Sequence, residues 1–153
     1  MPVSSDLDIT RILETTRTIA LLGASHKPDR ASHRVMQALL AHGYEVYPVN
    51  PGLAGQQLLG CKVHRNLAEI PVAIDMVDVF RQPLYLPGIV REVIAIGAKT
   101  LWTQLGVVDA AAAVTAEQAG LEVVMDRCPA IELPRLGIRK PGAAPVRPTV
   151  AAQ

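Results

Sequence analysis

Residues 18–32 read TIALLGASHKPDRAS, and this stretch decides the fold. The apolar run Ile19–Leu22 is typical of a strand buried on both faces, as in a parallel sheet. Gly23 then allows the backbone to turn sharply and to approach a ligand closely. Ser32 is a good N-cap for the helix that follows, whose first amides and positive dipole end are expected to face the same crevice. A strand, a glycine turn and a helix N-terminus together predict an anion site, usually for phosphate.

The loop after Gly23 is basic, but it lacks the full dinucleotide-binding fingerprint. Lys27 and Arg30 lie in the loop, and Arg34 lies at the start of the helix. Clusters of charge are usually solvated surface, but the position of this one on a glycine turn favours anion binding. From Gly23 onward the loop reads GASHKP instead of G-x-G-x-x-G. The missing glycines argue against an ordinary dinucleotide such as NAD as the ligand.

Composition favours a single α/β domain. The chain has 153 residues, of which 50% are hydrophobic but only 3% aromatic. A core built from Val, Leu, Ile and Ala suits a parallel sheet between helices better than an antiparallel sandwich. The formal net charge of +1 gives no general field for nucleic acid or for an anionic membrane. Any anion binding must therefore come from a local cluster.

Cysteine usage and hydropathy predict a soluble cytoplasmic protein without a metal site. Cys61 and Cys128 are too few for a disulfide framework and lack the spacing of metal ligands. The chain shows no signal peptide and no apolar run long enough to span a membrane.

Strands and helices are predicted to alternate along the chain, which gives an open, Rossmann-like, doubly wound parallel sheet of about five strands. Residues 1–139 are expected to form this one domain, and the Pro/Ala-rich residues 140–153 a disordered tail. In such sheets ligands bind beyond the carboxyl ends of the strands. The expected strands are 18–22, 44–49, 74–80, 99–103 and 121–125, with an edge strand in 58–63; the expected helices are 6–15, 33–42, 87–96 and 109–119.

The end of the second strand disfavours ordinary NAD binding. An NAD-binding unit usually places a carboxylate there for the ribose hydroxyls, whereas this strand ends in Val49, Asn50 and Pro51. A simple Asn-Pro turn would explain those residues equally well. The missing carboxylate nevertheless permits a ligand with an additional phosphate near the ribose. Arg30 as a partner of a 2′-phosphate keeps NADP open as an alternative.

Three residues at or near the other strand ends carry separate expectations. Asp78 lies in the middle of a strand and needs a partner, so we expect a structural carboxylate bonded to backbone amides or to a basic side chain. Gln104 and Gly106 follow a strand and are suited to amide and backbone contacts with a ligand. They extend the candidate site along the sheet edge.

Cys128 allows two interpretations. A single cysteine is more often a small buried apolar residue than a nucleophile. This one follows Arg127, whose guanidinium is expected to lower the thiol pKa and to favour thiolate. No His/Asn partner is evident in the sequence. A redox role, such as a mixed disulfide with a thiol ligand, stays open as the minority interpretation.

Five motifs in this order resemble the small bacterial and archaeal CoA-binding proteins. These proteins are stand-alone relatives of the CoA-binding Rossmann domain in the succinyl-CoA synthetase alpha subunit. The resemblance covers residues 6–138. Its motifs are IALLGAS…KP (19–28), HGYEVYPVNP (42–51), IDMVDVFR (74–81), AIGAKTLWTQLG (95–106) and VVMDRCPAIE (123–132).

The resemblance implies a non-catalytic domain that holds coenzyme A, or an acyl-CoA, across the carboxyl edge of the sheet. It assigns the phosphates to Gly23, Ala24, Ser25 and Lys27, with support from Arg30, Ser32 and Arg34. It assigns the groove wall to Val49, Asn50 and Pro51, the adenine-ribose border to Phe80 and Arg81, and the pantetheine arm to Gln104, Leu105 and Gly106. The synthetase subunit carries its phosphorylated histidine in a second domain, for which this chain has no room, so ligase chemistry is not expected.

Two other functions stay open at this point. One is an NAD(P)-linked oxidoreductase, although no hydride-acceptor or proton-donor constellation is visible in the sequence. The other is a thiol-redox regulatory protein that forms a mixed disulfide with CoA at Cys128. A homodimer and an acyl-CoA-handling protein are the partners that fit the first interpretation.

Overall fold

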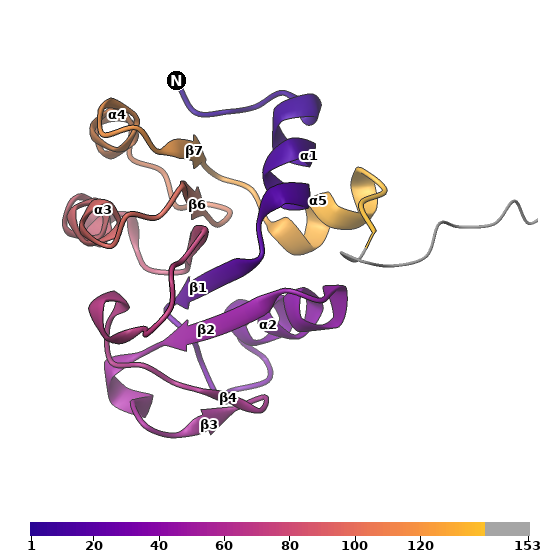
Figure 1. Ribbon diagram of the computed structural model, residues 1–153, viewed down its shortest axis with the longest axis vertical. Helices are drawn as coiled ribbons and strands as arrows, with labels where there is room; N and C mark the ends of the chain where they lie inside the picture. Colours follow the sequence, from indigo (N-terminus) through magenta and orange to yellow (C-terminus); the bar gives the residue numbers. More distant parts are fainter. Residues whose placement is uncertain (140–153) are drawn as a thin grey trace, which may run out of the picture.

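A computed structural model describes residues 1–139 as a five-stranded parallel sheet covered by helices on both faces (Figure 1). The predicted disordered tail, residues 140–153, lies outside the described residues. The strand order is β2-β1-β5-β6-β7, which confirms the predicted doubly wound α/β fold. The strands are β1 (Thr18–Leu22), β2 (Glu45–Val49), β5 (Met76–Val79), β6 (Thr100–Thr103) and β7 (Glu122–Val124).

Alternating side chains of the strands divide the core into two layers. In β1, Ala20 and Leu22 pack with α3 (Leu86–Ala95) and α4 (Ala110–Gln118). Ile19 and Leu21 point the other way. They share the second layer with α1 (Asp6–Thr15), α2 (Ala31–His42) and α5 (Pro129–Arg135), which lie across the sheet from α3 and α4 in Figure 1. Burial on both faces explains why the strands read as continuous apolar runs.

The strand order reverses between β1 and β5, which fixes where a ligand can bind. From β1 the chain crosses outward to β2, then returns past β1 to β5 and continues to β6 and β7. The crossovers on either side of this point diverge, so the loops after β1 and β5 leave a crevice at the carboxyl edge.

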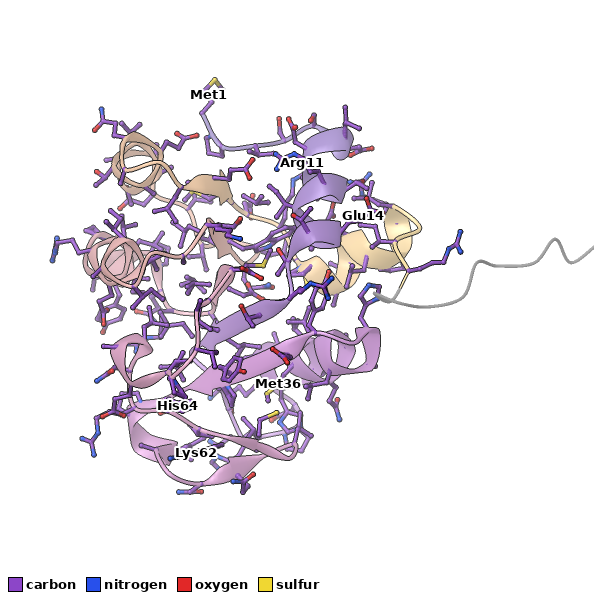
Figure 2. The ribbon with its side chains drawn as sticks, viewed as in Figure 1. Met1, Arg11, Glu14, Met36, Lys62 and His64 are labelled. Atoms are coloured by element: carbon purple, nitrogen blue, oxygen red, sulfur yellow. The ribbon has the colours of Figure 1, made fainter. Side chains whose placement is uncertain are left out.

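The segment predicted as one edge strand, residues 58–63, is instead a small hairpin. Its strands β3 (Gln57–Leu58) and β4 (Cys61–Lys62) are antiparallel and separate from the main sheet. Leu59 (φ +49°) and Gly60 (φ +81°) both adopt left-handed conformations, as a tight two-residue hairpin turn requires. The hairpin leads into His64, labelled in Figure 2, whose N–H donates to the Pro48 carbonyl (2.9 Å).

Helix α5 is absent from the helices predicted from the sequence, and Pro134, which lies within it, is a residue that disfavours helix interiors. Pro129 at its first position is a known start signal, since a proline there loses no intrahelical hydrogen bond. The helix is held by its buried Glu132, whose Oε1 accepts hydrogen bonds from Arg127 (3.3 Å) and Arg135 (2.6 Å). Three short 3₁₀ turns complete the described chain: η1 (Pro51–Leu53), η2 (Leu67–Glu69) and η3 (Pro83–Tyr85). Among residues 1–139, no helix has the length and apolar character needed to cross a membrane.

Candidate functional site

The turn after β1 is held tightly against the ends of β2 and β5. The N–H groups of Gly23 and Ala24 both donate to the Val49 carbonyl, at 3.1 and 3.2 Å. Gly23 has φ +96°, and a Cβ added there would lie only 3.2 Å from Phe80 Cβ and 3.3 Å from the Phe80 carbonyl carbon. Position 23 therefore requires glycine for its backbone conformation and for the close passage of the β5 loop.

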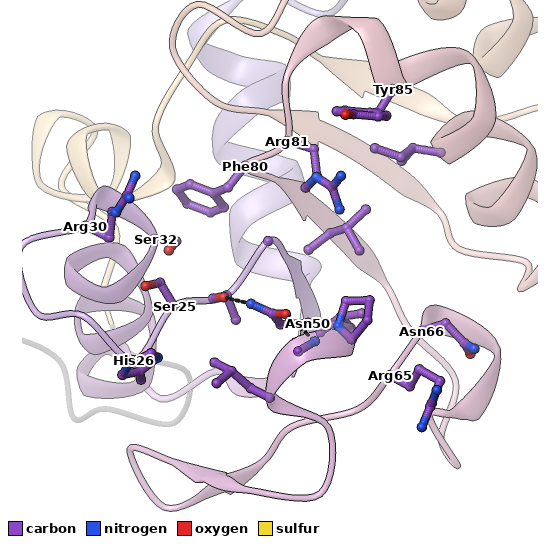
Figure 3. Close-up of a pocket in the computed structure, with 18 of the residues that line it drawn as sticks. Ser25, His26, Arg30, Ser32, Asn50, Arg65, Asn66, Phe80, Arg81 and Tyr85 are labelled. Atoms are coloured by element: carbon purple, nitrogen blue, oxygen red, sulfur yellow. Dashed lines mark hydrogen bonds between the residues drawn. The ribbon is translucent and has the colours of Figure 1, made fainter.

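Asn50 joins two loops of the site through its side chain. Its Nδ2 donates to the Ala24 carbonyl (2.7 Å), drawn as a dashed line in Figure 3, and its Oδ1 accepts from the Gly52 N–H (2.8 Å). Both ends of the amide are thus bonded within the protein. The predicted site residue Asn50 shapes the wall of the crevice, and a carboxylate at this position would lack the donor that holds the Ala24 loop.

Helix α2 begins at Ala31, two residues before the start at His33 that an N-cap at Ser32 would give, so the predicted N-cap is wrong. The N-cap is Arg30, whose backbone is extended (φ −79°, ψ 142°), and within the described residues no side chain caps the helix. Ser32 lies buried in the first turn. The start of α2 lines the crevice through Arg30, Ala31 and Ser32, and backbone donors without a side-chain cap suit an anionic ligand.

A cavity of about 860 Å³ opens at the carboxyl edge between these elements; we call it the edge cavity. Its cations come from separate segments: Lys27 and Arg30 before α2, Arg65 after β4 and Arg81 after β5. In Figure 3, Arg30 lies on one side of the cavity, with Arg65 and Arg81 on the other. The lining within the described chain includes a single carboxylate, Glu92, so the balance of charge favours an anion.

Arg81 is positioned by an aromatic ring. Its guanidinium carbon lies 4.5 Å from the centre of the Tyr85 ring, a cation–π arrangement (Figure 3). Tyr85 belongs to η3, which the proline at position 83 starts directly after the β5 loop. The result is a flat, positively charged surface on one rim of the edge cavity.

A second cavity of about 510 Å³, the side cavity, lies next to the first on the α2 and α5 side of the sheet. Ala31 and Phe80 line both cavities. Gln104 lines the side cavity and donates through Nε2 to both carboxylate oxygens of Asp78, at 3.0 and 3.3 Å. Asp78 is fully buried, and this burial raises its pKa to about 7, only partly offset by the Gln104 hydrogen bond. Its partner is thus a side-chain amide, and the predicted backbone or basic partner is wrong.

Cys128 also lines the side cavity, but its environment does not favour thiolate. Burial raises the pKa of the thiol, and the hydrogen bonds from the Ile131 and Ala130 N–H groups offset this increase only in part. The guanidinium of Arg127 points to Glu132 and to the Ser4 carbonyl. The expected lowering of the thiol pKa by Arg127 is therefore wrong, because α5 draws that side chain away.

The structure gathers most of the predicted site residues at one place. Arg34 and Gln104 line the side cavity instead of the edge cavity, and Gly106 is not among the described lining residues of either. The N–H of Gly106 donates to Asp126 Oδ1 (2.7 Å), which shapes the loop. The predicted residues that line the edge cavity are Gly23, Ala24, Ser25, Lys27, Arg30, Ser32, Val49, Asn50, Pro51, Phe80 and Arg81.

The sequence interpretation missed Arg65, Asn66 and Tyr85, which also line the edge cavity. Arg65 and Asn66 reach it because the hairpin returns the chain to the end of β2, where Val49 and His64 form a parallel bridge. No local motif marks that return. Tyr85 has only a weak signal in the sequence, as an aromatic residue two positions after Pro83 in the segment that follows β5.

Comparison with known proteins adds to this geometry. The CoA binding domain family matches residues 17–134, from the residue before β1 to within α5. The chain belongs to the CoA-binding domain family. The matched span contains the strand ends that form both cavities, so the family assignment and the candidate site refer to the same part of the molecule.

Three proteins similar to this chain show that the domain occurs both in small proteins and within a longer subunit. The uncharacterized protein YneT of Bacillus subtilis is 40% identical over 124 residues, covering 81% of this chain and 90% of that protein. A hypothetical protein from Pyrococcus horikoshii OT3 has a solved structure with a TM-score of 0.83 and 40% identity, covering 89% and 96% of the two chains. The alpha subunit of acetate–CoA ligase (ADP-forming) I from Pyrococcus furiosus is 31% identical over 80 residues, which are 50% of this chain but 17% of that subunit.

Proposed function

We propose that this protein binds coenzyme A, free or as an acyl thioester, without catalysing a reaction on it. The observation that carries the proposal is the edge cavity, in which a glycine turn, an uncapped helix start and cations from separate segments line one crevice at the strand-order reversal. Membership of the CoA-binding domain family supports coenzyme A as the ligand.

The arrangement of the cations suits the two phosphate groups of coenzyme A. That ligand carries a diphosphate and a separate phosphate on its ribose. We assign the diphosphate to the Gly23–Lys27 turn and the start of α2, where the Lys27 side chain, the first N–H groups of the helix and the helix dipole favour anions. We assign the ribose phosphate and the adenine to the opposite rim, where Arg65 and the Arg81–Tyr85 stack lie.

A thermal-shift experiment tests the proposal directly. Coenzyme A at 100 times its Kd is expected to add about 2.7 kcal/mol to the free energy of unfolding. The same concentrations of NAD and NADP should leave the Tm unchanged. A Tm increase with NADP but none with coenzyme A would overturn the proposal in favour of the oxidoreductase alternative.

Replacing Lys27 tests the position of the phosphates. Lys27→Met should weaken coenzyme A binding about tenfold, because a charge-assisted contact with a phosphate is lost. Lys62→Met is the matched control, since Lys62 is an exposed lysine of β4 that is not among the described lining residues. Calorimetric titration of both variants measures the effect. Equal weakening by the two substitutions would show that only net charge matters and would contradict the assigned contact.

A further inference from the structure

The two cavities have opposite chemical character although they adjoin. In the edge cavity the cations Lys27, Arg65 and Arg81 are prominent, whereas the side cavity is lined mainly by carbon. Its hydrogen-bonding side chains within the described chain are Arg34 and Gln104, together with the weakly polar thiol of Cys128. A ligand that bridges the two cavities must therefore be strongly anionic at one end and apolar at the other.

The Arg34 and Gln104 side chains both make hydrogen bonds within the protein, although the Arg34 guanidinium keeps its charge and further N–H donors. Gln104 donates to Asp78, and the Arg34 guanidinium donates from Nη1 to the Asp29 carbonyl (2.6 Å). The Asp78–Gln104 pair is buried, so the base of the cavity is held in one arrangement. Apart from the charged Arg34, the cavity provides a mainly apolar surface of defined shape.

Apolar side chains at the mouth of the side cavity lie open to solvent. Leu105 is 59% exposed and Ile131 is 50% exposed, from the β6 loop and from α5 respectively. Exposed apolar groups that line one cavity together often mark a ligand site. A volume of about 510 Å³ falls within the range of roughly 300–1,000 Å³ that is common for small-molecule sites.

We propose that the side cavity binds the acyl group of an acyl-CoA and favours apolar, straight-chain acyl groups. The proposal rests on the proposed coenzyme A site. With the diphosphate at the start of α2, the pantetheine arm can cross the border formed by Ala31 and Phe80 directly into the side cavity. The thioester end then lies among Val107, Leu105 and Ile131, where methylene groups are removed from water.

Calorimetric titration with coenzyme A, hexanoyl-CoA and succinyl-CoA tests this selection. Hexanoyl-CoA is expected to bind about tenfold more tightly than coenzyme A, because its methylenes are partly buried. Succinyl-CoA should bind less tightly than hexanoyl-CoA, since it has fewer methylene groups to bury and its terminal carboxylate would lose water.

Ile131→Asn locates the acyl group without changing the charge near the phosphates. This variant should bring the ratio of the hexanoyl-CoA and coenzyme A affinities to about one. Val114→Asn is the matched control: Val114 lies in α4, is 49% exposed, and is not among the described lining residues of either cavity. It should keep the tenfold preference.

The outcomes separate this proposal from the one on which it rests. If wild-type protein binds neither coenzyme A nor hexanoyl-CoA, the proposed function itself fails. If both bind equally, or succinyl-CoA binds most tightly, coenzyme A binding stands and the apolar acyl site is overturned. Loss of the preference in Val114→Asn would overturn its location in the side cavity.

Discussion

Gly23→Ala is expected to lower the free energy of unfolding by about 2–4 kcal/mol and to abolish measurable coenzyme A binding. Two costs combine. Alanine resists the backbone conformation at φ +96°, and its methyl group would lie 3.2–3.3 Å from Phe80 atoms, one of which is the backbone carbonyl carbon. Relief requires the β5 loop to move away from β1, and that loop forms the border of both cavities.

Gly120→Ala separates these two costs. Gly120 has φ +93°, almost the same conformation, but no described atom lies within 4 Å of an added Cβ. This variant should lose only about 1–2 kcal/mol and keep full ligand affinity. Urea unfolding and calorimetric titration of both variants give the comparison. Similar stability loss in the two, with ligand binding retained by Gly23→Ala, would show that close approach of the β1 and β5 loops is unimportant.

The sequence predicts best those residues of the candidate site whose position follows from a single strand and the loop directly after it. Gly23 and Lys27 follow a buried apolar run, so a local motif places them at the carboxyl edge, and in the structure both line the edge cavity. The absence of a carboxylate after β2 could also be predicted from the sequence, because Asn50 follows that strand directly.

Residues that tertiary contacts position could not be predicted in this way. Arg65 reaches the edge cavity only because a hairpin outside the main sheet returns the chain to Val49. Ser32 has the intrinsic preference of an N-cap, but the extended backbone occurs at Arg30, and the helix therefore starts at Ala31. The Cys128 thiol is buried at the start of α5. That helix is hard to predict from the sequence, because Pro134 lies within it.

Asp78 gives the fold a stability that falls as the pH rises. Its pKa is about 7 in the folded protein against an ordinary value of 3.8, so between these values the unfolded chain releases a proton that the native state retains. Fewer protons on the unfolded state mean that the free energy of unfolding decreases with increasing pH. This loss of stability begins as the pH rises above the ordinary pKa of 3.8 and reaches its full size once the pH exceeds about 7. Asp75, three residues earlier, behaves in the opposite way: partial burial alone would raise its pKa, but the Arg17 and Thr18 N–H groups and Lys99 lower it.

Asp78→Asn should therefore stabilise the protein, by an amount that increases by about 2–3 kcal/mol between about pH 5 and about pH 8. An uncharged amide can still bond the Gln104 side chain, which turns to present its oxygen, and no ionised group is left buried. Asp75→Asn is the matched control; it should destabilise the protein by a similar amount at both pH values, because Asp75 is ionised in both states across this window. Urea unfolding at the two pH values measures the difference. A stability gain in Asp78→Asn that does not depend on pH would mean that Asp78 is already ionised at the lower pH, with a pKa in the folded protein well below 7.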